Sequence, residues 1–312
     1  MSKNYKNELS DFHIWDQKKH SEDWILFPEN MGQNLCIDET SLTDGELYTI
    51  VTNADAKTQK GSLIAMIKGT KSIDIEKVLN KIPFEVREKV KTVSEDLADN
   101  MKKAVSNCFP LADIIIDRFH VVQLVNDAVQ KKRIEYRWKA IEEENKAIED
   151  NKKKNKRRNK KKKYVASVYE NGDTQKQLLA RSRYLLFKSK SKWTSSQKKR
   201  AEILFREFPE LESLYNLMMM FRNIYEKSIT REEAKIEYLK WYKKVEEKGF
   251  KVFNTAMNSI KNHEENILNF FNERRTNSLA ETFNSKIKAF RAAFRGVRDL
   301  SFFLYRVSLI FA

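Results

Sequence analysis

Residues Val93–His120, VSEDLADNMKKAVSNCFPLADIIIDRFH, decide how the rest of the chain is organised. Two apolar runs are each followed by an aspartate, Asp96 after residues 90–94 and Asp117 after residues 112–116. An amphipathic stretch lies between them, so the segment predicts a strand, a helix and a second strand. In an open α/β sheet, ligands bind outside the carboxyl ends of the strands, so both acids are expected to face a crevice.

A third acid, Asp38, ends the earlier run NLCID in the same manner. A single aspartate after a strand is most simply a residue of a solvated turn. Three such acids in one region would repel one another unless they bound a divalent cation. The repeated pattern therefore favours a metal-binding carboxylate cluster over three unrelated turns.

The composition indicates a helical, basic protein. The 312 residues include only 7 Gly and 4 Pro, which favours long helices over a turn-rich all-β fold. The net charge is +16 and the pI is near 9.5, so a polyanionic partner is expected, with nucleic acid as the leading candidate. The 11% aromatic content argues against a merely disordered basic tail.

Two cysteines, Cys36 and Cys108, lie in apolar surroundings without CxxC or Cys/His spacing. Neither a disulfide framework nor a structural zinc site is therefore expected, and a reducing cytoplasm fits. The N-terminus is polar, and no apolar run approaches the ~18 residues that a bilayer span needs. A soluble protein is expected.

Along the first half of the chain, residues 1–33 are expected to form an N-terminal arm laid over the domain. Three sequential antiparallel strands are predicted at residues 34–38, 45–53 and 61–69, and a helix in two pieces at residues 73–89. With the strand, helix and strand of the opening segment, the order becomes βββαβαβ. This order, with acids at the first and fourth strands, predicts an α/β fold of the ribonuclease H-like type.

His120 follows Asp117 by three residues. A lone histidine at a strand end is more often structural than a metal ligand, and here it could hold a neighbouring carboxylate by a hydrogen bond.

A basic block, KKKNKRRNKKKK, occupies residues 152–163, with ten basic residues in twelve. Such a block repels itself and forms either a solvated loop or a DNA-contacting segment. The two interpretations are compatible.

The region between this block and residue 262 predicts a helical insertion, with successive helices expected at residues 178–187, 195–208, 209–227, 231–248 and 250–261. Thr194 and Thr230 are expected as helix N-caps.

Near the C-terminus, Asn277, Glu281, Asn284 and Lys288 recur on one face of a predicted helix. This polar stripe could simply face solvent. The surrounding basic residues would instead suit a phosphate-handling site with one metal-binding acid; they are Arg274, Arg275, Lys286, Arg291, Arg295 and Arg298.

Three motifs in order, VSEDLADNMKKAVSNCFPLA, DRFHVV and TNSLAETFNSKIKAFRAAFRG, resemble the DDE transposases of bacterial insertion sequences. The similar subgroup has a D-x-F-H motif and an N-x-x-x-E-x-x-N-x-x-I-K helix, and the resemblance runs from about Gln33 to Ala312. It implies a ribonuclease H-like core with a large helical insertion before the last catalytic helix. It also implies a bacterial cytoplasmic protein associated with the nucleoid.

The resemblance implies that Asp38, Asp96 and Glu281 are the catalytic acids and hold two Mg²⁺ ions, with Mn²⁺ able to substitute. Asp117 and His120 are implied as supporting residues, with Asp117 an alternative second acid.

Contact with DNA is expected from fifteen residues: Lys152, Lys153, Lys154, Arg157, Arg158, Lys160, Lys161, Arg274, Arg275, Asn277, Asn284, Lys286, Lys288, Arg291 and Arg295. The implied partners are the element ends, target DNA and at least one further copy of the chain in the active complex.

The expected domains are residues 1–33, the arm; 34–134, the first part of the core; 135–265, the helical insertion; and 266–312, the helices that complete the core. A departure from the family is Ser278, which stands where Gly is common. Longer relatives carry an N-terminal zinc-binding and helix-turn-helix region, so this chain is expected to be the catalytic half of a split transposase, with a separate end-binding subunit, or a truncated copy. The alternatives in function are a ribonuclease H-like nuclease without strand transfer and a catalytically inactive DNA-binding descendant.

Overall fold

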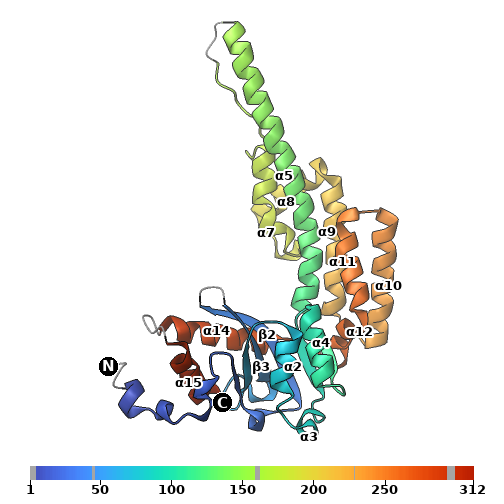
Figure 1. The fold of residues 1–312 in the computed structure, drawn as a ribbon. Coiled ribbons are helices and arrows are strands. Elements are labelled where there is room, and N and C mark those ends of the chain that lie inside the picture. The colour runs from blue at the N-terminus through green and yellow to red at the C-terminus, as the bar shows by residue number, and fades with distance from the viewer. Residues whose placement is uncertain (1–4, 44–45, 159–161, 228, 294–298) are drawn as a thin grey trace. The chain divides into compact units, whose positions relative to one another are not determined.

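The computed structural model describes residues 5–43, 46–158, 162–227, 229–293 and 299–312 (Figure 1). The chain divides into two compact units. Residues 1–120 and 264–312 together form one, which we call the sheet unit, and residues 121–263 form the other, the helical unit. The helical unit is thus an insertion in the sequence of the sheet unit.

The sheet unit contains one six-stranded mixed sheet, in the order β1-β4-β3-β2-β5-β6. Pairing is antiparallel from β1 to β2 and parallel from β2 through β5 to β6. The strands are β1 (Trp24–Leu26), β2 (Asn34–Thr43), β3 (Glu46–Asn53), β4 (Leu63–Lys68), β5 (Thr92–Glu95) and β6 (Asp113–Ile116). The predicted α/β fold of the ribonuclease H-like type is confirmed.

Helices cover the sheet on both faces. Five consecutive residues of β3, numbers 48–52, are buried, and neighbouring strand residues point to opposite faces. One face packs Tyr48 and Ile50 against Phe283 and Leu304. The helices of this unit are α2 (Ser72–Leu79), α3 (Phe84–Arg87), α4 (Asp99–Cys108), α12 (Glu264–Leu268), α13 (Phe270–Glu273), α14 (Ser278–Ala293) and α15 (Leu300–Phe311).

The first strand of the predicted site is longer than the run NLCID suggests. Asp38 was expected at its end, but β2 continues to Thr43 because its partner β3 pairs with it along the whole hairpin. On its other edge, β2 pairs with β5 only as far as Cys36. Asp38 therefore lies within β2, just past the end of its parallel pairing. The turn predicted at residues 44–45 lies outside the described residues.

The N-terminal segment is more than an arm. Its residues 24–26 form β1, which pairs with β4 at the edge of the sheet and buries Ile25 and Leu26. Before it, Phe12 packs edge to face on Phe302 at 5.2 Å between ring centroids. The predicted arm was wrong for residues 24–26, because their backbone pairing with β4 makes this short run an edge strand.

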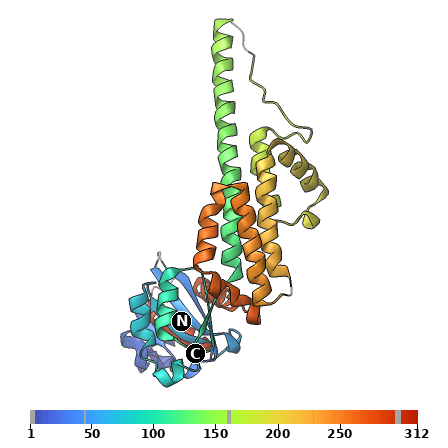
Figure 2. The same ribbon diagram turned by 90° about the vertical axis from the view of Figure 1, so that its right-hand side faces the viewer.

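The helical unit contains α5 (Arg118–Arg157), whose first three residues belong to the sheet unit. The predicted domain boundary at 134/135 falls within this unbroken helix. The other helices are α6 (Gln175–Arg181), α7 (Arg183–Leu186), α8 (Ser195–Glu207), α9 (Pro209–Glu226), α10 (Arg231–Lys248) and α11 (Lys251–Asn262). Figure 2 shows α9, α10 and α11 lying side by side with the first part of α5.

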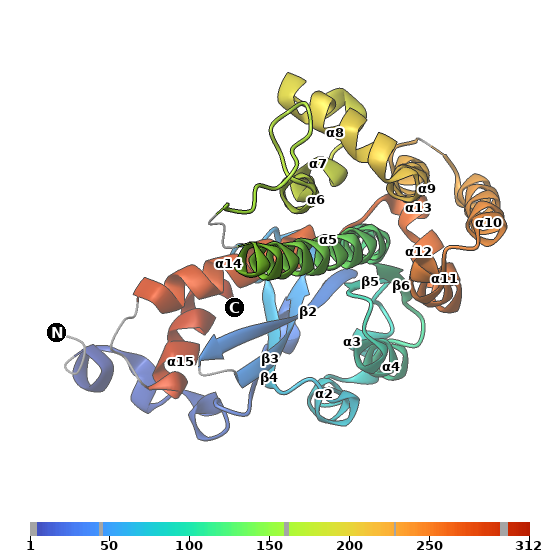
Figure 3. The same cartoon turned by 90° about the horizontal axis from the view of Figure 1, so that it is seen from above.

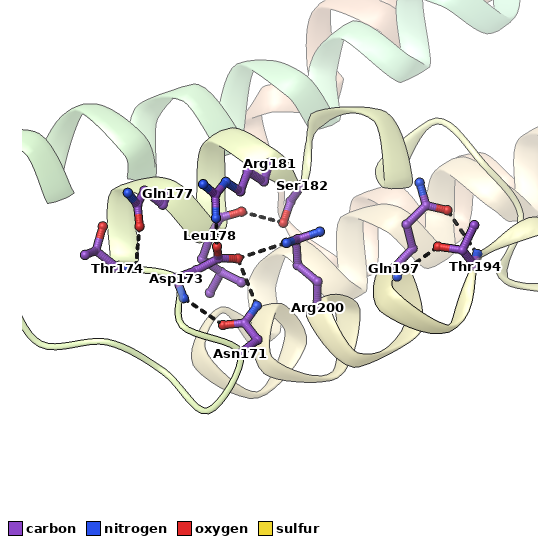
Figure 4. Close-up of polar contacts among 10 residues, drawn as sticks. All are labelled: Asn171, Asp173, Thr174, Gln177, Leu178, Arg181, Ser182, Thr194, Gln197 and Arg200. Atoms are coloured by element: carbon purple, nitrogen blue, oxygen red, sulfur yellow. Dashed lines mark hydrogen bonds and ion pairs between the residues drawn. The ribbon is translucent and has the colours of Figure 1, made fainter.

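Polar contacts hold the helical unit at defined points. The buried carboxylate of Asp173 accepts from Arg200 Nε at 2.9 Å and pairs with Arg181 (Figure 4). Thr194 caps α8, since its Oγ1 accepts from the backbone N–H of Gln197 at 3.2 Å. Thr230 caps α10 in the same way through Glu233, so both predicted N-caps are confirmed.

Two further findings bear on the expected class. Cys36 and Cys108 are both free and buried, so neither forms a disulfide. Among the described residues, no helix has the length and apolar composition that crossing a membrane requires.

Candidate active site

Three aspartates lie just past the points where the parallel pairing of β2, β5 and β6 ends. Asp38 lies within β2, Asp96 follows β5 and Asp117 follows β6. The strands β2, β5 and β6 are adjacent in the sheet (Figure 3), so the three aspartates lie in or directly after neighbouring strands. The helix α14, which carries Glu281, packs against β2.

Asp96, Asp117 and His120 form a compact group. One ligand atom from each lies within 4.8 Å of the others. His120 Nε2 lies 3.0 Å from Asp96 Oδ1, and the backbone N–H of Phe119 donates to Asp117 Oδ1 at 3.4 Å. The contact between His120 and Asp96 is the hydrogen bond to a neighbouring carboxylate that the sequence suggested.

Asp38 is 9% exposed, and both of its carboxylate oxygens are held. The backbone N–H of Glu39 donates to Oδ1 at 2.7 Å, and Asn284 Nδ2 donates to Oδ2 at 2.6 Å. Burial, followed by repulsion from Asp96, raises the pKa of Asp38 to about 7. The orientation of this carboxylate is therefore set by the protein, while its charge is unfavourable without a counterion.

Glu281 is exposed near the start of α14. Its negative charge contributes to the raised pKa of Asp38, so it acts on the aspartates electrostatically. Among the described residues, the group within ligand distance contains neither Asp38 nor Glu281. The structure thus brings Asp96, Asp117 and His120 into one group and leaves Asp38 and Glu281 beside it.

Two members of the group, Asp117 and His120, have raised pKa values. The hydrogen bond from Asp96 is the largest cause of the raised pKa of His120. Burial is the largest cause of the raised pKa of Asp117, although the nearby imidazole opposes it. Both shifts reflect carboxylates that are crowded into a partly buried site.

Two acids of the site are not distinguished by the sequence pattern. Glu95 is fully buried, neither of its carboxylate oxygens has a hydrogen-bond partner in the described part of the chain, and burial raises its pKa to about 8. Burial and the charge of Asp96 raise the pKa of Glu39. Each precedes or follows a predicted site residue directly, and adjacency is the only signal that the sequence offers for them.

Two predicted DNA-contacting residues do not fit that role. Asn277 and Asn284 are 0% and 6% exposed. Their amides donate to Asp96 and Asp38 at 3.3 and 2.6 Å. Because both side chains are turned inward against the acids, the expectation that they touch DNA was wrong.

The basic residues that were predicted to contact DNA differ in their surroundings. Lys286 Nζ donates to the carbonyl of Thr58 at 2.9 Å, and Arg275 Nε pairs with Glu273 at 2.5 Å. Arg291 lies over the ring of Phe303, 4.9 Å from its centroid. The remaining described ones are exposed: Lys152, Lys153, Lys154, Arg157, Arg158, Arg274 and Lys288. Lys160, Lys161 and Arg295, as well as Arg298 of the basic surroundings, lie outside the described residues.

The donor set suits a divalent cation. Carboxylate oxygens are the ligands that Mg²⁺ and Mn²⁺ prefer, and imidazole is a ligand for transition metals. Burial is the largest cause of the raised pKa values of Asp38 and Asp117, and repulsion from Asp96 contributes to both; a bound cation would oppose both effects. The residues of this site therefore fit a metal ion.

Carboxylate clusters that hold divalent ions are typical of nucleases and polymerases. The fold and the site together thus define a protein of the class that acts on nucleic acid. In agreement, a family model described as a transposase, DDE_Tnp_ISL3, matches residues 35–307, and the chain belongs to this family of insertion-sequence DDE transposases. It is a DNA transposase, and DNA is its partner. Comparison with curated proteins and with solved structures found no match.

Proposed function

We propose that the chain cuts DNA at the ends of an insertion sequence and joins them to target DNA by metal-dependent phosphoryl transfer. Asp38, Asp96 and Glu281 are the proposed catalytic acids. The observation that supports this assignment is electrostatic: the charges of Asp96 and Glu281 both contribute to the raised pKa of Asp38. Three acids from β2, β5 and α14 therefore share one local field, which two divalent ions would balance.

Bound Mg²⁺ or Mn²⁺ supplies activation of the attacking water or 3′-hydroxyl and stabilisation of the leaving oxygen. The chain's own residues orient the acids. The hydrogen bonds from Glu39 N–H and Asn284 hold Asp38, and His120 holds Asp96 from the start of α5. Asp117, within ligand distance of Asp96, supports the same site.

DNA contact is proposed for the exposed basic residues. Five of them lie in the last turns of α5 or directly after it and are Lys152, Lys153, Lys154, Arg157 and Arg158. Their charges supply the phosphate contacts that duplex binding needs. A second copy of the chain in the active complex follows from the chemistry, since two element ends must be cut and joined together.

The test is Mg²⁺-dependent nicking of DNA that carries the element ends, together with any separate end-binding subunit. Asp38→Asn and Glu281→Gln keep the shape of each side chain but remove its charge, so each should lower nicking and strand transfer about a hundredfold or more. Glu85→Gln, on the exposed surface of α3, is the matched control and should cut at the wild-type rate.

Folding and DNA binding of both variants should remain near wild type. Nicking by Glu281→Gln at the wild-type rate would exclude the proposed site. Cut products without joined products, over a range of target DNA, would instead identify a nuclease that does not transfer strands.

A further inference from the structure

Two buried asparagines face the acids: Asn277, the residue before α14, and Asn284, which lies on α14. Asn277 Nδ2 donates to the carbonyl of Ile37 at 3.2 Å and to Asp96 Oδ1 at 3.3 Å. Asn284 Nδ2 donates to Asp38 Oδ2 at 2.6 Å and to the carbonyl of Glu39 at 3.4 Å. Each amide thus joins one carboxylate to one backbone carbonyl of β2.

The amide nitrogens, and not the oxygens, must face the acids. Carboxylates and carbonyls only accept hydrogen bonds, so an amide oxygen in the same place would meet two acceptors. The consequence is that Asn277 Oδ1 and Asn284 Oδ1 are buried without a hydrogen-bond partner among the residues that the structure describes. Leaving a buried acceptor unpaired is unfavourable, and the hydrogen bonds to charged acceptors offset that cost.

The two backbone carbonyls lie in the part of β2 that no longer pairs with β5. Pairing of β2 with β5 ends at Cys36. Beyond Cys36, the carbonyls of Ile37 and Glu39 accept hydrogen bonds from the amides of Asn277 and Asn284. The asparagine side chains therefore replace the missing strand as hydrogen-bond donors at this edge.

We propose that Asn277 and Asn284 are positioning residues, which clamp α14 to β2 and orient Asp96 and Asp38 for the reaction. Glu281 follows Asn277 by four residues and precedes Asn284 by three, so the two clamps bracket it on the helix. Fixing both ends of this interval fixes where Glu281 stands relative to the aspartates. The role in catalysis rests on the proposed function, whereas the clamp itself does not.

The first arm of the test uses the metal-free protein and measures hydrogen–deuterium exchange of α14. Asn284→Asp is isosteric, but it replaces the donor nitrogen with an oxygen that faces the two carboxylate oxygens of Asp38. The exchange rate of α14 should therefore rise by about tenfold or more. The double variant Asp38→Asn with Asn284→Asp restores one donor and one carboxylate across the 2.6 Å contact, although not the longer bond to the Glu39 carbonyl, so exchange should return most of the way to the wild-type rate. Ser285→Ala, an exposed neighbour on the same helix, is the control.

Wild-type exchange in Asn284→Asp, or failure of the double variant to restore slow exchange, would overturn the clamp. If Asn284→Asp does not fold, recovery of folding in the double variant supports the clamp and continued unfolding contradicts it. If Asn284 only filled space, the isosteric change to Asp would leave the exchange rate of α14 unchanged.

The second arm measures calorimetric Mn²⁺ binding and nicking of end DNA at saturating Mn²⁺. Asn284→Ala and Asn277→Ala should each lower the nicking rate about tenfold or more, with DNA binding unchanged, because small misplacements of reacting groups are costly. Unchanged nicking rates in both variants would overturn the catalytic part. Wild-type protein that neither binds Mn²⁺ nor nicks would refute the proposed function, and the exchange measurements would still decide the clamp.

Discussion

His120 Nε2 lies 3.0 Å from Asp96 Oδ1, so the first turn of α5 is tied to the acid that follows β5. Asp117, which precedes the same helix, contributes the third ligand atom of this group. The motif DRFH therefore places two side chains against Asp96 from one short segment. This arrangement makes the separate roles of Asp96 and Asp117 testable.

Asp96→Asn should abolish nicking at any Mg²⁺ or Mn²⁺ concentration if Asp96 holds the metal. Asp117→Asn should keep activity that rises with added metal, because a supporting acid tunes affinity without being essential. The measurement is the nicking rate over a metal titration for each variant. The reverse pattern would move the second catalytic acid to Asp117.

Between about pH 5 and about pH 8, the stability of the metal-free protein should fall as pH rises. The folded-state pKa values of Asp38 and His120 are raised above their ordinary values, so the folded state binds more protons than the unfolded state. For Asp38, with a pKa of about 7, this stabilisation is complete below about pH 4 and is lost as pH rises through 7. The unfolding temperature of wild type should therefore drop, relative to Asp38→Asn, between pH 5 and about pH 8.

The same titration predicts how Mg²⁺ acts. A cation competes with protons for the carboxylates, so Mg²⁺ should raise the unfolding temperature more at pH 8 than at pH 6. The comparison needs one buffer ionic strength and the Asp38→Asn variant as reference. Equal stabilisation by Mg²⁺ at the two pH values would contradict the metal assignment.

Replacing the ten basic residues of the block at 152–163 with Ser or Gln should weaken DNA binding alike for all sequences. Each phosphate contact that is lost should lower the steepness of log K against log salt by about 0.9 on duplex DNA. Binding to two unrelated duplexes over a salt series measures this slope. An unchanged slope would identify the block as a solvated segment.

Asp38 and Glu281 should behave as one unit although 243 positions separate them in the sequence. The double variant Asp38→Asn with Glu281→Gln should nick no more slowly than either single variant, because residues that act together are non-additive. Rates from single-turnover nicking, with DNA binding as control, decide this. Multiplied losses in the double variant would indicate independent roles.

Local sequence patterns predicted much of the fold. Apolar runs with period two and stretches with period 3.6 identified the βββαβαβ order from β2 to β6 and the helices from α8 to α11. Asp96 and Asp117, which follow the two apolar runs, were also predicted to lie at one end of the sheet, because the carboxyl ends of parallel strands lie together. These features depend on residues close together in the chain, so the sequence by itself determined them.

Tertiary structure decided what the same residues face. The stripe of Asn277, Glu281, Asn284 and Lys288 has a helical period, but a period does not tell an inward face from a solvent face. Asn277 is buried because it meets Ile37, 240 residues earlier. Likewise, Asp38 lies within β2 because pairing with β3 extends the strand past it. Such outcomes depend on partners distant in sequence, and only packing of the complete chain brings those partners together.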